Sequence, residues 1–297
     1  MRGILVVNEF LKSKKFDEIY EFLLEAGKKA SRQIEFAVMT NAEVLANPEG
    51  VKEQMPDFVL FWDKDVRAAA LIEKLGIRVF NSSRAIQICD DKSVAYMELL
   101  NTDVKMPETF VGPLTFGFED KEHTVLTSAE RKLGYPLVIK ENCGSFGAQV
   151  YLAKDRESAV KIIDDVSGRG YIIQEFVEST YGKDIRINMV GNRCVAAMKR
   201  INENDFRANI TNGGRMEKYS PTEQQIDMAT KVMKYLKLDF AGVDIMFGKD
   251  GEPVFCEVNS NAHFKNIYDC TGVNVANHIM EYIIDEMACN SETKHEL

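Results

Sequence analysis

Two carboxylates and a side-chain amide late in the chain have the spacing of a divalent-cation site. Residues 239–259 read as two short strands joined by Asp250-Gly251, a dipeptide that favours a tight turn because both positions tolerate positive φ. Pairing outward from that turn sets Asp244 opposite Glu257, with Asn259 two residues along on the same face. Like charges directly opposite each other destabilise a sheet, so a cation should lie between these two carboxylates.

The same register gives the hairpin one apolar face and one polar face. The apolar pairs are Phe247–Val254, Ile245–Cys256 and Val243–Val258, and the opposite face pairs Met246 with Phe255 and Gly242 with Asn259. Three hard oxygen donors with room left for water and phosphate suit Mg²⁺ better than Zn²⁺ or Ca²⁺. The alternative is an ordinary hairpin whose solvated face carries acids.

Composition sets broad limits on the partners of this chain. With 297 residues, 45% hydrophobic and 28% charged, the chain can hold two or three modules of an ordinary globular kind. A formal net charge of −9 argues against nucleic acid or an anionic membrane as the main partner. No apolar run approaches the roughly 18 residues that a membrane span needs. Six scattered cysteines without a Cys-x-x-Cys pair, and a first apolar run too short for a signal peptide, favour a cytoplasmic protein with reduced thiols.

The first 80 residues alternate between strand and helix patterns, which predicts a small α/β unit with a mainly parallel sheet. The expected strands are Ile4–Val7, Ile34–Met39, Asp57–Trp62 and Ile77–Phe80, and the expected helices are Lys14–Lys29 and Asp65–Leu75. The segment Asn8–Ser13 after the first strand has none of the glycines of a dinucleotide-binding turn. We therefore expect this unit to form part of a substrate cleft or a supporting wall.

The rest of the chain predicts two further α+β modules. Asn81-Ser-Ser is a capping signal, and residues 82–100 read as two helices, the second starting at Asp90-Asp91-Lys92. The later strands are expected at Leu137–Lys140, Ala148–Ala153, Tyr171–Gln174, Ile185–Val190 and Arg193–Lys199, and the later helices at 156–166, 221–236 and 273–287. Gly191-Asn192 predicts a second hairpin turn.

Several features upstream of the acidic hairpin suit an anionic ligand. Lys140 ends an apolar strand and is followed by a loop with Gly144 and Gly147, whose backbone N–H groups could approach phosphates, although a solvated lysine is the simpler interpretation. The segment 174–177 leaves a strand with backbone groups that could meet an adenine edge, and Asp184 could accept hydrogen bonds from ribose. An interdomain linker with a surface acid explains them equally well.

Four cations lie in sequence segments near the hairpin, namely Arg186, Lys199, Arg200 and Arg207. In a chain with net negative charge, such a group needs either an anionic ligand or structural ion pairs. The sequence leaves both explanations open.

Together these motifs resemble the ATP-grasp superfamily, and specifically its RimK-like carboxylate–amine ligases, the alpha-L-glutamate ligase family. The motifs, in order, are Asp91-Lys92, Val138–Lys140 with Gly144–Gly147, Gln174–Val177, Asp184–Arg186, Asp205–Asn209, Gly213-Gly214, Ala241–Asp244 and Glu257–Asn259. The resemblance is close over residues 85–285 and extends to the N-terminal module in architecture only. It implies an ATP-grasp fold of mixed α/β and α+β class, with an N-terminal module at 1–84, a small lid subdomain at 85–182 and a C-terminal subdomain at 183–297.

The resemblance also implies a role for individual residues. Lys140 would contact the ATP phosphates, with Lys92 as a second cation, while Glu175 and Phe176 would frame the adenine and Asp184 would hold the ribose. Arg207 and Asn209 would reach the triphosphate or an acyl-phosphate. Asp244, Glu257 and Asn259 would bind two Mg²⁺ ions, bridged by Glu257, and Mn²⁺ could substitute.

The implied reaction needs no side-chain nucleophile. A substrate carboxylate attacks the γ-phosphate of ATP to give an acyl-phosphate and ADP, and an amine then displaces phosphate to form an amide. Arg200 and Arg207 are the candidates for stabilising the acyl-phosphate and its tetrahedral adduct. Glutamate is the expected amino-acid substrate.

One segment departs from the glutamate-adding pattern. After Glu257-Val-Asn259, glutamate-adding members typically continue with a small residue and then Ser-Pro-Gly, whereas this chain has Ser260–Asn266. That continuation is closer to the LysX-type branch, which joins an amino acid to the C-terminal glutamate of a carrier protein. His263 could contact this acceptor or act as a base, or be an ordinary loop histidine. Arg215 could bind an amino-acid carboxylate or be solvated.

Two other function classes stay open on the sequence. A regulatory protein could keep the ATP site without ligation, and a kinase-like ATP-grasp enzyme could phosphorylate without an amine step. The expected partners are a small amino acid, a peptide or a carrier-protein C-terminus, with no nucleic acid and no membrane. Ligases of this kind are often dimers or tetramers, so the resemblance also implies that the protein could form a homo-oligomer.

Overall fold

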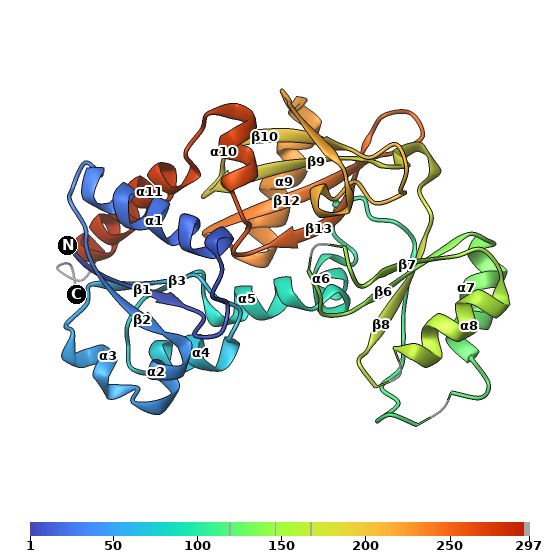
Figure 1. Ribbon diagram of the computed structural model, residues 1–297, viewed down its shortest axis with the longest axis horizontal. Coiled ribbons are helices and arrows are strands. Elements are labelled where there is room, and N and C mark those ends of the chain that lie inside the picture. Colours follow the sequence, from blue (N-terminus) through green and yellow to red (C-terminus); the bar gives the residue numbers. More distant parts are fainter. Residues whose placement is uncertain (119, 146, 167, 294–297) are drawn as a thin grey trace.

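A computed structural model describes residues 1–118, 120–145, 147–166 and 168–293 of the chain, which form three β-sheets flanked by helices (Figure 1). The N-terminal sheet is parallel, in the order β2-β1-β3-β4. Its strands are β1 (Arg2–Val7), β2 (Glu35–Thr40), β3 (Phe58–Phe61) and β4 (Val79–Phe80), and the helices of this module are α1 (Lys14–Lys29), α2 (Asn41–Ala46), α3 (Glu49–Glu53), α4 (Val66–Lys74) and α5 (Ser83–Asp90). The predicted parallel α/β unit is confirmed.

The N-terminal sheet is buried on both faces, which is why its central strands are almost entirely apolar. In β1, Leu5 and Val7 pack towards α1, whereas Ile4 and Val6 pack towards α2 and α4. The sequence pattern does not predict α2 or α3, since the two helices have six and five residues and carry little periodicity. A capping box between Thr40 and Glu43 begins α2.

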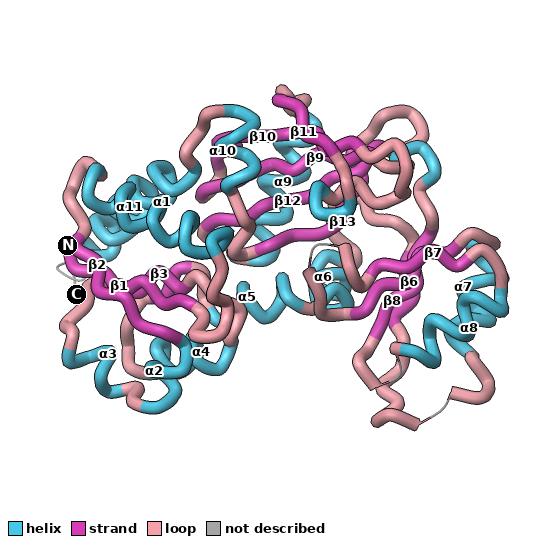
Figure 2. Tube along the Cα trace, viewed as in Figure 1, coloured by secondary structure: helices cyan, strands magenta, loops and turns pink. Residues whose placement is uncertain are grey.

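The second sheet is antiparallel, in the order β5-β8-β6-β7, and lies at the opposite end of the molecule from the N-terminal sheet (Figures 1 and 2). Its strands are β5 (Thr109–Val111), β6 (Leu137–Glu141), β7 (Val150–Ala153) and β8 (Tyr171–Glu175), and α7 (Thr124–Leu133) and α8 (Arg156–Asp165) cover one face. In β6, Leu137 and Ile139 pack under these helices, so Val138 and Lys140 point to the other face. The sequence pattern does not predict β5 or α7.

The third sheet is also antiparallel, in the order β11-β10-β9-β12-β13. Its strands are β9 (Lys183–Val190), β10 (Arg193–Ile201), β11 (Arg215–Lys218), β12 (Phe240–Phe247) and β13 (Pro253–Asn259). The neighbouring helices are α6 (Lys92–Leu99), α9 (Glu223–Leu236), α10 (Lys265–Thr271) and α11 (Val275–Thr293), with short 3-10 turns η1 (Glu178–Thr180) and η2 (Ile210–Asn212). One face packs on α9 through residues such as Ile185, Ile187 and Val243, which leaves the alternate residues of the same strands for the other face.

The last helix ties the two ends of the chain together. Helix α11 lies beside α1, and its residues Ile279, Met280 and Ile283 share one hydrophobic core with Leu5 of β1 and Phe240 of β12 (Figure 1). The N-terminal and third sheets therefore share a core. Within the described residues, no helix combines the length and the apolar character that crossing a membrane would require.

Asn81 fixes the start of the acidic hairpin against the N-terminal module. The predicted capping signal at Asn81-Ser-Ser is confirmed at Ser82, whose side chain accepts the Ala85 N–H, 3.2 Å away. The buried Asn81 amide instead donates to the carbonyls of Phe240 (2.9 Å) and Ser260 (2.8 Å) and accepts from the Asp239 N–H (2.7 Å).

Replacing Asn81 by Ala should therefore destabilise the fold. The change removes the hydrogen-bond partner of four buried backbone groups, two carbonyls and two N–H groups, so we expect the free energy of unfolding to fall by about 2–4 kcal/mol. Urea denaturation followed by circular dichroism measures this. Asn277→Ala, on the exposed surface of α11, is the matched control and should change stability by less than about 0.5 kcal/mol. Equal effects of the two substitutions would contradict the bridging role.

Candidate active site

The acidic hairpin forms, and the three predicted pairs nearest the site are confirmed, Val243–Val258 among them. Asp244 lies opposite Glu257, and Gly242 lies opposite Asn259. The pairs predicted nearer the turn are wrong, because Ile245 pairs with Phe255 rather than Cys256. The two pairs displaced in the same way are Met246–Val254 and Phe247–Pro253.

Two departures from the expected hairpin cancel at the site. The loop has three residues, 249–251, closed by the Gly248 N–H donating to the Glu252 carbonyl at 2.8 Å, with Gly251 at a φ of +82°. That loop shifts the register by one residue, and a β-bulge at Cys256 shifts it back before Glu257 is reached. Because of the bulge, the consecutive side chains of Cys256 and Glu257 both border the same cavity.

Asp244 belongs to a buried network of four charged side chains. Arg186 on β9 donates to both Asp244 oxygens at 2.6 Å, and Arg200 on β10 donates to both Asp184 oxygens at 2.6 Å and to Asp244 Oδ2 at 2.9 Å. Burial alone would raise the pKa of Asp244, but the two guanidiniums outweigh burial and lower it. Structural ion pairs therefore account for Arg186 and Arg200.

The oxygen atoms of Asp244, Glu257 and Asn259 could bind a magnesium ion, because the ion pairs do not use all of their lone pairs. Asp244 Oδ2 accepts from two guanidiniums, whereas Oδ1 accepts from Arg186 alone and keeps one lone pair. Glu257, whose side chain is 30% exposed, has a weak contact to Arg186 at 3.8 Å and one from Asn259 Nδ2 at 3.4 Å. The described residues contain no group of three or more His, Cys, Asp or Glu side chains placed for a metal, so this site depends on two acids and one amide.

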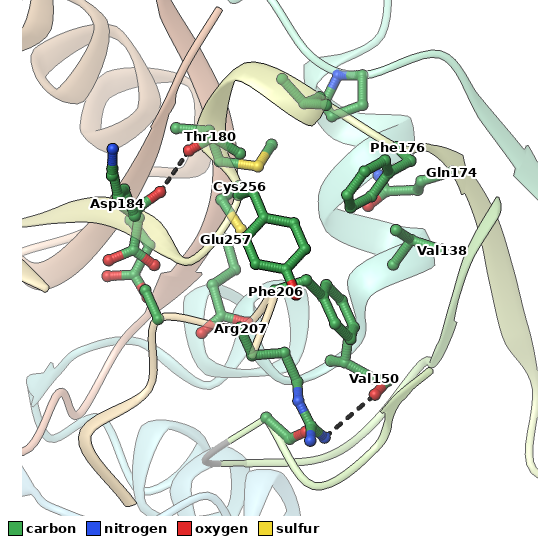
Figure 3. A pocket seen from close by; sticks show the side chains of 18 of the residues that line it. Val138, Val150, Gln174, Phe176, Thr180, Asp184, Phe206, Arg207, Cys256 and Glu257 are labelled. Atoms are coloured by element: carbon green, nitrogen blue, oxygen red, sulfur yellow. Dashed lines mark hydrogen bonds between the residues drawn. The ribbon is translucent and has the colours of Figure 1, made fainter. Parts of the chain in front are cut away.

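A first cavity lies between the second and third sheets (Figure 3). It encloses about 760 Å³ of empty space, with open solvent at its mouth included. Its apolar lining includes Val138, Val150, Phe176, Phe206 and Met246, and its charged lining includes Lys140, Asp184, Arg200, Arg207, Asp244 and Glu257. An elongated ligand with one flat apolar end and one anionic end matches this division.

Most of the residues predicted to bind a nucleotide line this one cavity. They are Lys140, Glu175, Phe176, Asp184, Arg207 and Asn209. The sequence predicts no individual role for Phe206, Val138 or Val150, because apolar residues of short strands and loops resemble core residues until the fold shows them facing a cavity. Phe206 directly precedes Arg207 and stands 6.3 Å from Phe176, centroid to centroid.

The glycine loop after β6 is held on several sides. At its base, the Lys92 N–H donates to the Asn142 carbonyl at 2.9 Å. Arg207, which also pairs with Asp205, donates to the carbonyls of Gly147 (3.0 Å) and Val150 (3.3 Å). Lys140 and Gly147 both line the first cavity, so the loop reaches the cavity where the predicted phosphate contacts lie.

Two more cavities meet the first at Glu257. The second, lined by Lys64, Lys92, Gly144 and Asn259, encloses about 530 Å³ of empty space. The third encloses about 1520 Å³ and lies between the N-terminal module and the third sheet, with Arg186, Arg200, Asn209 and Asn259 in its wall. Of the described residues, Glu257 alone borders all three.

Three other candidates occupy different positions. Lys199 points away from the site, because strand alternation turns it from the face of Arg200 and sets its ammonium 5.5 Å from the Phe247 ring centroid. Arg215 begins β11, exposed and paired with Glu217 and Glu203, and lines none of the three cavities.

His263 lies in the wall of the third cavity, and its Nε2 donates to the Lys15 carbonyl at 2.9 Å. In the neutral ring that bond leaves Nδ1 as the unprotonated nitrogen, which is buried and has no hydrogen-bond partner among the residues that the structure describes. Burial lowers the pKa of His263, which favours the neutral ring.

Comparison with known proteins decides the family. The model of the RimK-like ATP-grasp domain matches residues 89–283, which include every candidate site residue discussed above except those of the N-terminal module. The chain belongs to the RimK-like ATP-grasp family. This family membership makes the chain one of the ATP-grasp carboxylate–amine ligases, as the motifs predict.

Named relatives and solved structures agree with this assignment. A probable alpha-L-glutamate ligase of Trichodesmium erythraeum is 35% identical, with 71% of this chain and 69% of that protein covered. Human N-acetylaspartylglutamate synthase A is 32% identical over 79% of this chain, which spans only 59% of that longer protein. A D-alanine–D-alanine ligase from Bacillus anthracis, complexed with ATP, superposes with a TM-score of 0.75 over 99% of both chains at 19% identity. The predicted ATP-grasp fold is thus confirmed.

The buried ion-pair network around Asp244 should contribute to the stability of this ATP-grasp protein. Arg186→Met removes the bidentate partner of a carboxylate that is 1% exposed, although Arg200 still contacts it, so we expect the free energy of unfolding to fall by about 3 kcal/mol. Lys199→Met is the matched control on the neighbouring strand and should cost less than about 1 kcal/mol. Chemical denaturation compares the two, and a loss in Lys199→Met equal to that in Arg186→Met would refute the network.

Proposed function

We propose that this chain is an ATP- and Mg²⁺-dependent, ADP-forming ligase that joins a carboxylate to an amine through an acyl-phosphate. The observation that carries the proposal is the position of Glu257, a predicted magnesium ligand that borders all three cavities. A nucleotide in the first cavity and an acceptor in the third would reach it from different sides. Bond formation at their meeting point needs no enzyme nucleophile.

The lining of the first cavity supports a bound nucleotide. The apolar part, with Val138, Phe176 and Phe206, suits a purine ring, and Glu175 lies beside Phe176 at the end of β8. Asp184 would accept from ribose through lone pairs that Arg200 leaves over.

The polar end of the cavity supports a triphosphate. Lys140 and Arg207 supply cations for the phosphates, and Asn209 lies where this cavity meets the third. Lys92, on the second cavity beside Gly144, is the further cation that the family resemblance implies.

Magnesium, as the two ions that the family resemblance implies, would be held by Asp244 Oδ1, Glu257 and Asn259. Bound Mg²⁺ draws charge from the phosphate oxygens, and Mn²⁺ accepts the same oxygen donors. Arg186 and Arg200 fix the orientation of the Asp244 carboxylate, so that its remaining lone pair keeps one direction.

The reaction follows from which groups meet at the junction. A carboxylate oxygen of the acceptor attacks the γ-phosphorus, the bond to the bridging oxygen of ADP breaks, and an acyl-phosphate results. The amine nitrogen then bonds to the acyl carbon, loses a proton and expels inorganic phosphate. Arg200 and Arg207 are the proposed stabilisers of the acyl-phosphate and its adduct, with Arg200 bordering both the first and third cavities.

Glutamate is our proposed amino-acid substrate, since the names of both named relatives contain it. A larger acceptor is a second candidate, favoured by two observations. The third cavity has about twice the empty space of the first, and the LysX-like segment 260–266 supplies Asn261, His263 and Asn266 to its wall. Such an acceptor would be a peptide or carrier-protein C-terminus.

ADP release against all amino acids, singly and in pairs, with mass spectrometry of the products, tests the function. An amide product with ADP and phosphate supports ligation. A phosphorylated product without an amide would instead support a kinase-like enzyme. Nucleotide binding without turnover across the panel, peptides included, would support a regulatory protein.

Glu257→Gln should abolish turnover without disturbing the fold. The substitution removes a charged metal ligand that has no strong ion pair, so we expect kcat to fall about 10³-fold, equivalent to about 4 kcal/mol of transition-state stabilisation. Asp244→Ala is a poorer test, because it also leaves two buried guanidiniums without a shared partner. Mg²⁺-dependent turnover within tenfold of wild type in Glu257→Gln would reject the metal assignment.

Phe206→Ala should weaken nucleotide binding. Stacking of a base on an aromatic ring contributes about 1–3 kcal/mol, so we expect the Kd for MgATP to rise at least about fivefold. Isothermal titration calorimetry measures it. Phe116→Ala is the matched control, because that ring is 79% exposed and lines none of the three cavities. An unchanged Kd in Phe206→Ala would place the base elsewhere.

A further inference from the structure

The third cavity reaches past the family-matched residues into the N-terminal module, where it meets a buried carboxylate. Asp63 follows β3, is only 4% exposed, and lines this cavity together with Asn8 and Tyr20. Neither the sequence motifs nor the family match at 89–283 assigns Asp63 a role. A buried carboxylate in a cavity wall needs a physical explanation, because burying an ion is costly unless it is paired.

The hydrogen-bond partners of Asp63 are all neutral. Asn8 Nδ2 donates to both carboxylate oxygens at 3.1 Å, and the backbone N–H groups of Lys64 and Asp65 add further bonds. The Phe10 N–H donates to Asn8 Oδ1 at 2.9 Å, which fixes the amide with its hydrogens towards Asp63. These dipoles orient the carboxylate without compensating its charge.

The cations nearest in sequence are committed to other acids. The Lys64 ammonium pairs with Asp90 at 2.6 Å, and the Arg67 guanidinium lies 3.6 Å from Asp65. Among the described residues, no lysine, arginine or histidine forms an ion pair with Asp63. Burial raises the pKa of Asp63, and the hydrogen bonds from Lys64 and Asn8 only partly offset it. A ligand cation would supply the missing charge.

A metal ion is the wrong cation for this position. Among the described residues that line the third cavity, the carboxylates are Asp63 and Glu257, and Glu257 belongs to the proposed magnesium site. Beside Asp63, the Asn8 side chain presents hydrogens rather than its oxygen. An ammonium group needs only hydrogen-bond acceptors and negative charge, which Asp63 provides.

We propose that Asp63 binds the primary ammonium of an amino-acid or peptide substrate held in the third cavity. Lys64 and Arg186 line the same cavity, but each is already paired with an acid of the chain, so the selectivity that we propose is for the ammonium. The identity of this ligand as a substrate rests on the proposed ligase function, whereas the ammonium subsite itself does not. An N-acetylated amino acid has no ammonium and should bind poorly.

Equilibrium binding to the full-length chain tests the subsite. In the presence of Mg²⁺ and a non-hydrolysable ATP analogue, the twenty amino acids and a set of dipeptides are each compared with their N-acetylated forms by calorimetry. We expect at least one free-amine ligand to bind about 30-fold more tightly than its acetylated form, as for a desolvated charge pair. If no free-amine ligand binds more tightly than its acetylated form, the proposal is overturned.

Substitutions of Asp63 test whether this residue causes the preference for the free amine over the acetylated ligand. Asp63→Asn, and Asp63→Ser if the first unfolds, should reduce the preference to less than about threefold while the affinity for the ATP analogue stays within twofold of wild type. Asp17→Asn, an equal charge loss on the exposed face of α1, should keep the preference. A preference that survives both Asp63 substitutions would overturn the assignment.

Two further measurements show which substrate carries the ammonium and distinguish the ammonium subsite from the proposed ligase function. Mass spectrometry of products formed from amino-acid pairs shows whether the selected amine becomes the amide nitrogen or stays free in the product. If ADP release fails with every substrate but Asp63-dependent binding persists, the ligase proposal falls and the ammonium subsite stands.

Discussion

The architecture of the site depends on one carboxylate that two guanidiniums share below the surface of the third sheet. Asp244 cannot be buried alone, and Arg186 and Arg200 make its burial tolerable while fixing its direction. The three residues come from adjacent strands β12, β9 and β10, so the network holds only if those strands keep their register. Asp244 Oδ1 accepts one hydrogen bond and keeps a lone pair, and Glu257 lies opposite Asp244 on the neighbouring strand, where we propose a metal site.

Around this fixed point the other parts of the chain supply different surfaces. The second sheet gives the apolar wall and the lysine of the first cavity, through the face that α7 and α8 do not cover. The N-terminal module closes the third cavity from the opposite side, and the core it shares with α11 holds it there. Two ligands can thus meet at Glu257 without sharing a cavity.

The sequence predicts the pairing at the centre of the site correctly, but not the pairs nearer the turn or the position of Lys199. The predicted Asp244–Glu257 pair is correct although the loop has three residues and not two. The longer loop shifts the pairing by one residue, and the bulge at Cys256 shifts it back. A bulge leaves no pattern in the sequence that alternation can detect. Proximity in sequence predicts Lys199 among the site cations, but strand alternation turns it to the other face.

The sequence by itself determined the longer strands and helices, the oxygen-rich hairpin and the resemblance to the family, because these depend on local periodicity and on residue types at short spacing. Only the tertiary structure decided that Asp244 is paired rather than exposed, that Phe206 faces a cavity, and that Asp63 borders the same cavity as Glu257. Those facts depend on contacts between residues far apart in the chain. Whether a charge is neutralised or an aromatic ring is covered is set by what folds against it.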